Sequence, residues 1–372
     1  MTRLRPPIWL SAPSRFASFK RPQARWALAA LALLLALSLT ALISAGPLTP
    51  MHDPADDARN RTDVGLYTSI TEAVRHGGNY YAVAAAAQRS DGYPMRPFVT
   101  MRLPTLTMVQ ATLPHAVTIA LLYALAAGVL FAWYRKLFPA LNSQAPRVVA
   151  LLLAACGGLV FVRTDLVAFH EIWAGLLIAL SLGVWRQDRW IEAAAIATCA
   201  MLIRETAALY AIVMLICAFA TGHKREAAGW AIGLAALGVA VLSHAYAWSL
   251  VVRPDDPVGL GWSGLLGFGF FIKLTALLTA LAALPLWLGA PLVGLALFGW
   301  SAWRDPTALR ALAVCAAYAA LISLFCRADT SYWGLMVVPL ALIGLVFVPD
   351  GLRDLVTIAR ERRRITVTRI VP

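Results

Sequence analysis

Asp63 is the first residue in this sequence whose type and position suggest chemistry. It follows Thr62, a suitable helix N-cap, and apolar residues then recur at helical spacing until Gly77 and Gly78 end the run. Those apolar residues are Val64, Tyr67, Ile70 and Val74. We therefore predict a surface helix with Asp63 at its amino end and Tyr67 one turn away on the same side. An acid at this position could carry chemistry, although the helix dipole alone also favours an acid there.

A proline-rich segment follows that helix in the sequence. Residues 92–104 read Gly-Tyr-Pro-Met-Arg-Pro-Phe-Val-Thr-Met-Arg-Leu-Pro. The prolines restrict the backbone and so make the segment rigid. Arg96 and Arg102 are the kind of side chain that binds phosphate through paired N–H donors. The pattern therefore predicts either a phosphate-binding segment or a loop that is simply well packed.

Charged residues also lie at the ends of apolar runs further along the chain. They form three clusters: Arg163 and Asp165 with His170 and Glu171; Arg204 with Glu205; and Arg327 with Asp329. An uncompensated charge at membrane depth costs on the order of 3 kcal/mol, so these residues serve either as ion pairs between helices or in binding. We predict that Asp63, His170, Glu171, Arg204 and Arg327 converge on one outward-facing cavity suited to an anionic lipid headgroup.

The remaining acids and the cysteines are less informative. Asp53, Asp56 and Asp57 indicate a solvated acidic linker. The five cysteines lie in or beside apolar runs, and none is spaced for a zinc site or a disulfide framework. We therefore expect no cofactor, and a divalent metal is not indicated.

The elements that position these residues are predicted to be membrane helices. Of the 372 residues 60% are hydrophobic and only 14% are charged, which is too little polar surface for a soluble domain. We expect an all-α, polytopic membrane protein with about ten transmembrane helices and amphipathic surface helices in the first outer loop. The apolar runs are 26–45, 114–134, 148–162, 166–185, 191–203, 207–221, 227–250, 282–303, 307–325 and 331–348. Before the run at 282–303, we expect a helix lying on the outer surface with Lys273 reaching the interface.

The distribution of charge predicts the topology. With ten crossings, the cytoplasmic segments contain 21 of the 32 Lys and Arg residues but only 7 of the 19 Asp and Glu residues. This asymmetry is what the positive-inside rule requires, and it accounts for the net charge of +13 without nucleic acid as a partner. We therefore expect a basic cytoplasmic amino end at 1–25, one transmembrane domain at 26–348 with an outer loop at 46–113, and a basic cytoplasmic tail at 349–372. The expected location is the plasma (inner) membrane of a bacterium.

These features together resemble the GT-C class of membrane glycosyltransferases, which includes the protein mannosyltransferases and the aminoarabinose transferases of lipid A. In that class an outer loop after the first span carries an acid and a tyrosine on a surface helix, then an aromatic segment and a proline-rich stretch. The matching residues here are Asp63, Tyr67, Gly77-Gly78-Asn79-Tyr80-Tyr81 and 93–104, and Arg204-Glu205 is similar to an Arg-Glu pair at the outer end of a middle span. The resemblance covers residues 26–215. The Asp-Glu pair common in the class is Asp63-Val64 here.

The resemblance implies an activity and a donor. The donor would be a polyprenyl-phosphate sugar with its lipid in the membrane, and Asp63 would be the catalytic base. Arg204, Arg96 or Arg327 would hold the leaving phosphate. The other residues expected to bind substrate are Tyr67, Arg102, Arg163, His170, Glu171 and Glu205. Because Asp63 has no acidic neighbour, a metal is not assumed.

Two other functions are compatible with the same residues. A transporter or flippase of lipids or solutes would also need buried charges and many spans, and a non-catalytic scaffold of a polysaccharide pathway would need only the spans. A transporter requires a cavity that can open on both faces of the membrane. A glycosyltransferase requires Asp63 beside a cavity open to the outer leaflet.

Overall fold

The computed structural model describes residues 6–44 and 63–360. Over these residues the protein is all-helical and forms no strands, as the sequence predicts. Some expectations lie outside the described residues. They concern the acidic linker of Asp53, Asp56 and Asp57, the N-cap Thr62, and the tail beyond Arg360.

The α-helices follow one another from end to end of the chain. They are α1 (Arg21–Leu39), α3 (Asp63–Arg75), α4 (Tyr80–Asp91), α5 (Thr105–Thr112), α6 (His115–Leu137), α7 (Gln144–Gly158), α8 (His170–Val184), α9 (Ile191–Ile203), α10 (Ala208–Ala220), α11 (Lys224–Ser249), α12 (Gly267–Leu277), α13 (Leu286–Ala302), α14 (Pro306–Phe325), α15 (Val338–Ala341) and α16 (Val348–Arg360). The 3-10 segments include η1 (Arg15–Ser18), η9 (Ala328–Met336) and η10 (Leu342–Phe347).

Five of these helical segments are long and apolar enough to cross a membrane, or six if a bent pair counts as one span. The five are Arg21–Leu42, His115–Ala140, Gln144–Val162, Lys224–Ser249 and Pro306–Phe325, and the bent pair joins Ala328–Met336 to Val338–Arg360 at 54°. The shorter apolar helices include α8, α9, α10, α12 and α13. The protein therefore has the helices of a membrane protein, and the predicted runs after 166 mostly form shorter helices than a full span.

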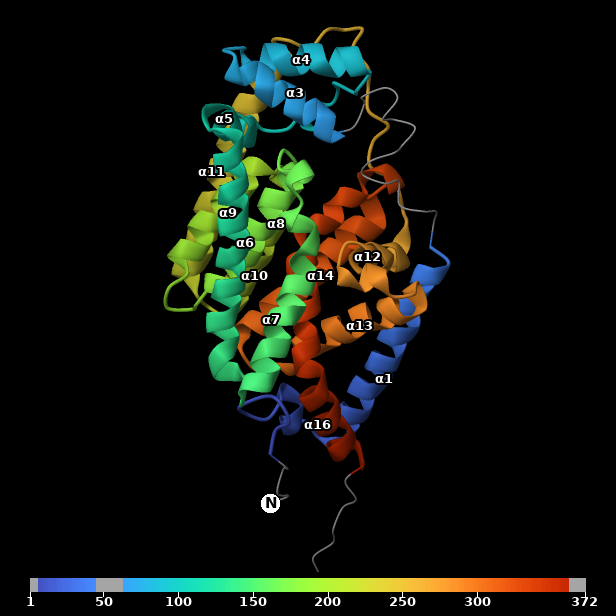
Figure 1. Cartoon of the computed structure of the whole chain (residues 1–372). Helices are drawn as coiled ribbons and strands as arrows, with labels where there is room; N and C mark the ends of the chain where they lie inside the picture. The colour runs from blue at the N-terminus through green and yellow to red at the C-terminus, as the bar shows by residue number, and fades with distance from the viewer. Residues whose placement is uncertain (1–5, 45–62, 361–372) are drawn as a thin grey trace, which may run out of the picture.

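The bundle has two distinct ends, which Figure 1 shows at the top and bottom of the view. The amphipathic helices α3 and α4, together with α5, cover one end, while η1 and α16 lie at the other. At this second end the buried Asp350 carboxylate accepts hydrogen bonds from the backbone N–H groups of Ile8, Trp9 and Leu10 at 2.7, 2.8 and 2.9 Å. The two terminal segments are thus bound to each other, on the side opposite α3.

The helices approach closely where glycines face each other across the bundle. A Cβ atom on Gly299 of α13 would lie 1.8 Å from the Gly344 carbonyl oxygen, and one on Gly344 would lie 2.0 Å from the Ala296 oxygen. No other residue fits at these positions, so α13 and η10 pack backbone to backbone. Such contacts between small residues are typical of helices that associate within a membrane.

Two predicted elements differ from what the structure contains. Helix α12 does not lie on the outer surface: Phe270, Phe271 and Leu274 are buried, and the helix packs between α14, α13 and the end of α1. The run predicted at 331–348 is not one regular helix but the sequence η9, α15 and η10. In both cases the side chains pack against protein, and apolar composition alone does not distinguish such packing from contact with lipid.

Candidate active site

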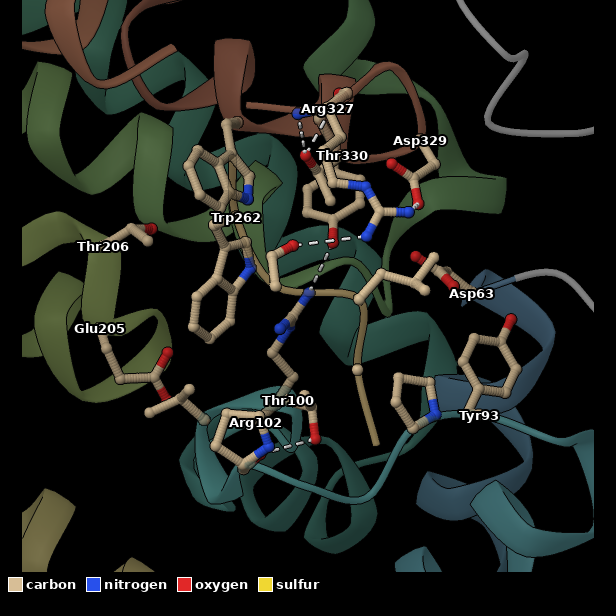
Figure 2. A pocket seen from close by; sticks show the side chains of 18 of the residues that line it. Asp63, Tyr93, Thr100, Arg102, Glu205, Thr206, Trp262, Arg327, Asp329 and Thr330 are labelled. Carbon is tan, nitrogen blue, oxygen red and sulfur yellow. Dashed lines mark hydrogen bonds and ion pairs between the residues drawn. The ribbon is translucent and has the colours of Figure 1, made fainter. Parts of the chain in front are cut away.

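A cavity of about 600 Å³ lies beneath α3 at the end of the molecule that carries α3 to α5. We call it the Asp63 cavity. Its walls come from the start of α3, the proline-rich segment, the turn between α9 and α10, and two later segments at 259–262 and 327–333. Figure 2 shows Asp63 and Tyr93 on one side and Glu205 and Thr206 on the other, with Arg102 and Arg327 between them. Segments far apart in the sequence thus share one site.

Asp63 lies at the first residue of α3, where the sequence predicts the amino end of a helix. Its carboxylate lines the cavity, is half-buried, and accepts a hydrogen bond from the Tyr93 side chain. Burial raises the pKa of this carboxyl above its ordinary value, although Arg102 and the hydrogen bond from Tyr93 oppose the shift. A carboxylate with a raised pKa is a better proton acceptor than an ordinary surface aspartate.

Tyr67 fixes the position of α3 above the bundle. Its buried ring packs edge-on against the rings of Phe169 and His170, with centroids 6.1 and 5.0 Å away. The Arg102 guanidinium lies 5.7 Å from the centroid of the same ring. Because these contacts come from α8 and from the proline-rich segment, Tyr67 holds Asp63 over the cavity.

Arg102 enters the cavity from the proline-rich segment and is 5% exposed. Its Nη2 donates to the Tyr332 hydroxyl at 3.3 Å and lies 3.5 Å from Oε1 of Glu171. Its Nε has no hydrogen-bond partner among the described residues. These contacts are long or absent, so Arg102 is a buried cation that is only weakly compensated.

Arg204 is compensated much more fully. Its Nε donates to Oε1 of Glu171 at 2.5 Å, and its Nη1 donates to Oε2 of Glu205 at 3.0 Å. Glu171 is completely buried in the first turn of α8, so it lies behind the cavity wall and is shared by Arg204 and Arg102. Arg204 and Glu205 separate α9 from α10, as the sequence predicts, and both line the cavity.

Arg327 forms the opposite side of the cavity. Its Nη2 donates to Oδ2 of Asp329 at 2.7 Å, and its Nη1 donates to the Gly261 carbonyl at 3.4 Å. With this pair, the lining contains three guanidinium groups and three carboxylates, from Arg102, Arg204, Arg327, Asp63, Glu205 and Asp329. The charges of the lining balance, so an anionic ligand would depend on the weakly paired Arg102 rather than on overall charge.

Three other predicted site residues do not line the cavity. The Arg96 guanidinium donates to the carbonyls of Pro254 and Asp256 at 3.0 and 2.7 Å, and so it holds the 254–257 segment instead of facing a ligand. Arg163 forms an exposed pair with Asp165 at 2.5 Å. His170 is buried against Tyr67, outside the lining. Arg163 and His170 were predicted from their position at the end of an apolar run and Arg96 from its residue type, and neither signal corresponds to a place in the lining.

Sequence reasoning also missed the aromatic part of the cavity. Trp262, Tyr332 and Trp333 line it, next to the charged residues. Trp262 follows Gly259-Leu260-Gly261 in a segment between two apolar helices, and an aromatic residue in such a glycine-rich segment is a signal that could have been used. The other two lie close after Arg327 in η9. They give the cavity flat apolar surfaces beside its charges.

Potential metal ligands are not clustered: within 6–44 and 63–360, no group of three or more His, Cys, Asp or Glu side chains could hold a metal ion. No family model, curated protein or solved structure matches this chain. The geometry of the cavity is therefore the basis on which a function can be assigned.

Replacing Glu171 by Gln tests whether this carboxylate holds the site together. Glu171→Gln keeps the shape of the side chain but leaves Arg204 and Arg102 without their shared charge, so we expect a loss of about 3 kcal/mol in the free energy of unfolding. Thermal unfolding of the purified protein in detergent measures the effect. The matched control is Glu192→Gln, whose exposed pair with Arg189 at 2.8 Å should contribute nothing measurable. Equal melting temperatures for the two variants would contradict the assignment.

Proposed function

We propose that the protein is a membrane glycosyltransferase of GT-C type, which moves a sugar from a polyprenyl-phosphate donor to an acceptor on the outer face of the inner membrane. One observation carries the proposal: a half-buried carboxylate, Asp63, lines the same cavity as the weakly compensated Arg102. A base for the acceptor and a cation for the leaving phosphate are the two groups this transfer needs. The product would belong to a cell-envelope glycan or glycolipid.

The residues divide the chemistry between them. Asp63 takes the proton from the acceptor hydroxyl while the acceptor oxygen bonds to the anomeric carbon. The bond between that carbon and the phosphate oxygen breaks, and polyprenyl phosphate leaves with the electron pair. Arg102 stabilises the charge that grows on the phosphate, and Arg204 and Arg327 belong to the same lining. Trp262 and Trp333 offer faces on which the apolar side of a sugar ring can pack.

The proposed membrane arrangement has ten crossings with both termini in the cytoplasm. The long spans and the bent pair would supply six crossings, helices α8, α9 and α10 three more, and α12 with α13 the last. Helices α9 and α10 have 13 residues each, or about 20 Å of rise, which is short for a span of about 30 Å. Their junction at Arg204 lines the cavity, so these helices need to reach only the floor of a depression.

A transporter or flippase would use the bundle differently. It needs a path from the cavity to the other end, and that end is filled by packed aromatic side chains. Trp300 contacts Trp133 and Phe347 with ring centroids 5.6 Å apart in each pair, and Phe347 stacks on Trp303 at 4.9 Å. This packing favours an enzyme with a cavity open at one end over a transporter. A non-catalytic scaffold would need only the spans. The cavity lined by Asp63 and the charged residues around it therefore favours an enzyme over a scaffold.

Asp63→Asn tests the catalytic role. The variant keeps the shape and the hydrogen bonding to Tyr93 but removes the base, so we expect sugar transfer to fall by about 100-fold or more while the melting temperature stays unchanged. In the wild type the basic form of Asp63 is required, so activity should be lost as the pH falls through its raised pKa. The acid limb of kcat/KM should therefore lie above the pH expected of an ordinary aspartate, and the residual activity of Asp63→Asn should lack that limb.

The comparison with Arg204→Ala separates the two roles. Arg204 is bonded to Glu171 and Glu205, so its loss should lower the melting temperature as well as the activity. Full activity of Asp63→Asn with a polyprenyl-phosphate sugar would refute the catalytic assignment. Movement of lipid between leaflets by a wild-type protein that transfers no sugar would replace the enzyme with a flippase.

Cysteine labelling tests the proposed topology. Ser90 is exposed in α4, which lies at the end of the bundle that carries α3 to α5, and Gln187 is exposed in the segment after α8. In a background without the native cysteines, we expect an impermeant thiol reagent to label a cysteine at Ser90 in intact cells but not one at Gln187. Both should label after the cells are opened. Labelling of both in intact cells, or of Gln187 alone, would exclude the ten-crossing arrangement.

A further inference from the structure

A second cavity of about 350 Å³ lies between α1, α13 and α14. We call it the α1–α14 cavity. Its lining is apolar apart from Ser301, and its larger side chains include Phe16, Leu31, Leu34, Leu297, Phe298 and Leu312. It contains none of the residues of the Asp63 cavity. An apolar space of this kind excludes water and can accept an apolar occupant.

The shape of the α1–α14 cavity fits a chain that runs along the helices. Its lining spans Ala27 to Leu34 on α1 and Leu312 to Ala319 on α14, which is about 10 Å along each helix axis. Ala30 and Ala316 belong to the lining and are both exposed, so small residues mark a mouth on the outer surface of the bundle. A hydrocarbon chain could therefore enter from the side.

Two arginines lie beside the Phe16 end of this cavity. Arg15 precedes Phe16, and its Nη2 donates to the Trp303 carbonyl at 2.9 Å; Arg304 follows Trp303, and its Nε donates to the Ser14 carbonyl at 3.0 Å. Both guanidinium groups are thus held where η1 meets the end of α13. Burial lowers the pKa of Arg15, and the nearby positive charge of Arg304 lowers it further.

Neither arginine has an acidic partner in the part of the chain that the structure describes, since no ion pair within 6–44 and 63–360 includes Arg15 or Arg304. Two like charges held near each other without a counter-ion favour an anion between them. Trp26, which is 78% exposed near the same end of α1, is the kind of residue that marks a membrane interface. The two cations therefore lie at about the depth of lipid headgroups.

We propose that Arg15, Arg304 and the α1–α14 cavity together bind one anionic phospholipid, with its phosphate on the two guanidinium groups and one acyl chain in the cavity. The charge of the arginines selects an anionic headgroup, and the adjoining apolar space selects a lipid over a free phosphate ion. The bound lipid would join η1, α1, α13 and α14 at the end of the bundle that holds both termini. The site is independent of the proposed sugar transfer.

Lipid binding to the purified full-length protein tests the proposal. Native mass spectrometry in detergent can compare phosphatidylglycerol with phosphatidylcholine of the same acyl chains. We expect the wild type to prefer phosphatidylglycerol, and Arg15→Gln with Arg304→Gln to weaken its binding at least about tenfold. Glutamine at position 304 carries a donor where the Arg304 Nε donates to the Ser14 carbonyl, whereas glutamine at position 15 is too short to reach the Trp303 carbonyl. The melting temperature of the double variant therefore checks that the fold survives. Ala316→Leu, which fills the mouth and keeps both arginines, should weaken binding to a similar extent.

The control removes the same charge from another surface at this end. Arg21 and Arg25 line a separate open groove on α1, so Arg21→Gln with Arg25→Gln should leave binding within about twofold of the wild type. An equal loss of phosphatidylglycerol binding in the control variant would mean that general surface charge explains the effect, and it would overturn the proposal. Equal binding of the two lipids, normal binding by Ala316→Leu, or displacement of phosphatidylglycerol by millimolar inorganic phosphate would each overturn it as well.

Discussion

The fully buried carboxylate of Glu171 is the interaction on which the rest of the Asp63 cavity depends. It lies in the first turn of α8, 2.5 Å from the Arg204 guanidinium and 3.5 Å from that of Arg102. A buried carboxylate without a partner would be very costly, so it draws together the turn between α9 and α10 and the proline-rich segment after α4. Three parts of the chain that are distant in sequence thus meet at one charge. Tyr67 packs on Arg102 and on the neighbouring His170, which extends the assembly to α3 and places Asp63 above the cavity.

Arg204 and Arg102 share the Glu171 carboxylate unequally, because Arg204 is much closer to it. The charge of Arg204 is therefore mainly structural, whereas that of Arg102 remains available to a ligand. Arg204 has close contacts to two carboxylates, and Arg327 has one to Asp329, so both are largely compensated before any ligand arrives. Arg102 has only long contacts and an Nε without a described partner. An anion that enters the cavity therefore gains most from Arg102, and the acid that faces it is Asp63. This pairing of a half-buried carboxylate with an incompletely paired cation is the observation that supports the proposed transfer from a phosphate ester.

The sequence allows the elements to be predicted better than the contacts between them. Helix α3, which the described residues show from Asp63, and the interruption at Arg204 and Glu205 follow from local rules of periodicity and the cost of charge in an apolar run. The burial of α12 could not be predicted, since an apolar helix has the same composition whether it contacts protein or lipid. Trp262 and Trp333 were missed because nothing local links them to Asp63. Arg96 was misplaced for the converse reason: its type suits phosphate, but its contacts are backbone carbonyls.

If the Asp63 cavity receives a lipid-linked phosphate through Arg102, the purified protein should bind polyprenyl phosphate. Equilibrium binding of polyprenyl phosphate to the protein in nanodiscs tests this directly, with the tryptophan fluorescence of Trp262 and Trp333 as the signal. We expect saturable binding of polyprenyl phosphate and at least about tenfold weaker binding of the uncharged polyprenol. Arg102→Gln should weaken polyprenyl phosphate binding to a similar extent. Equal affinities for the phosphate and the alcohol, or an unchanged affinity in Arg102→Gln, would contradict it.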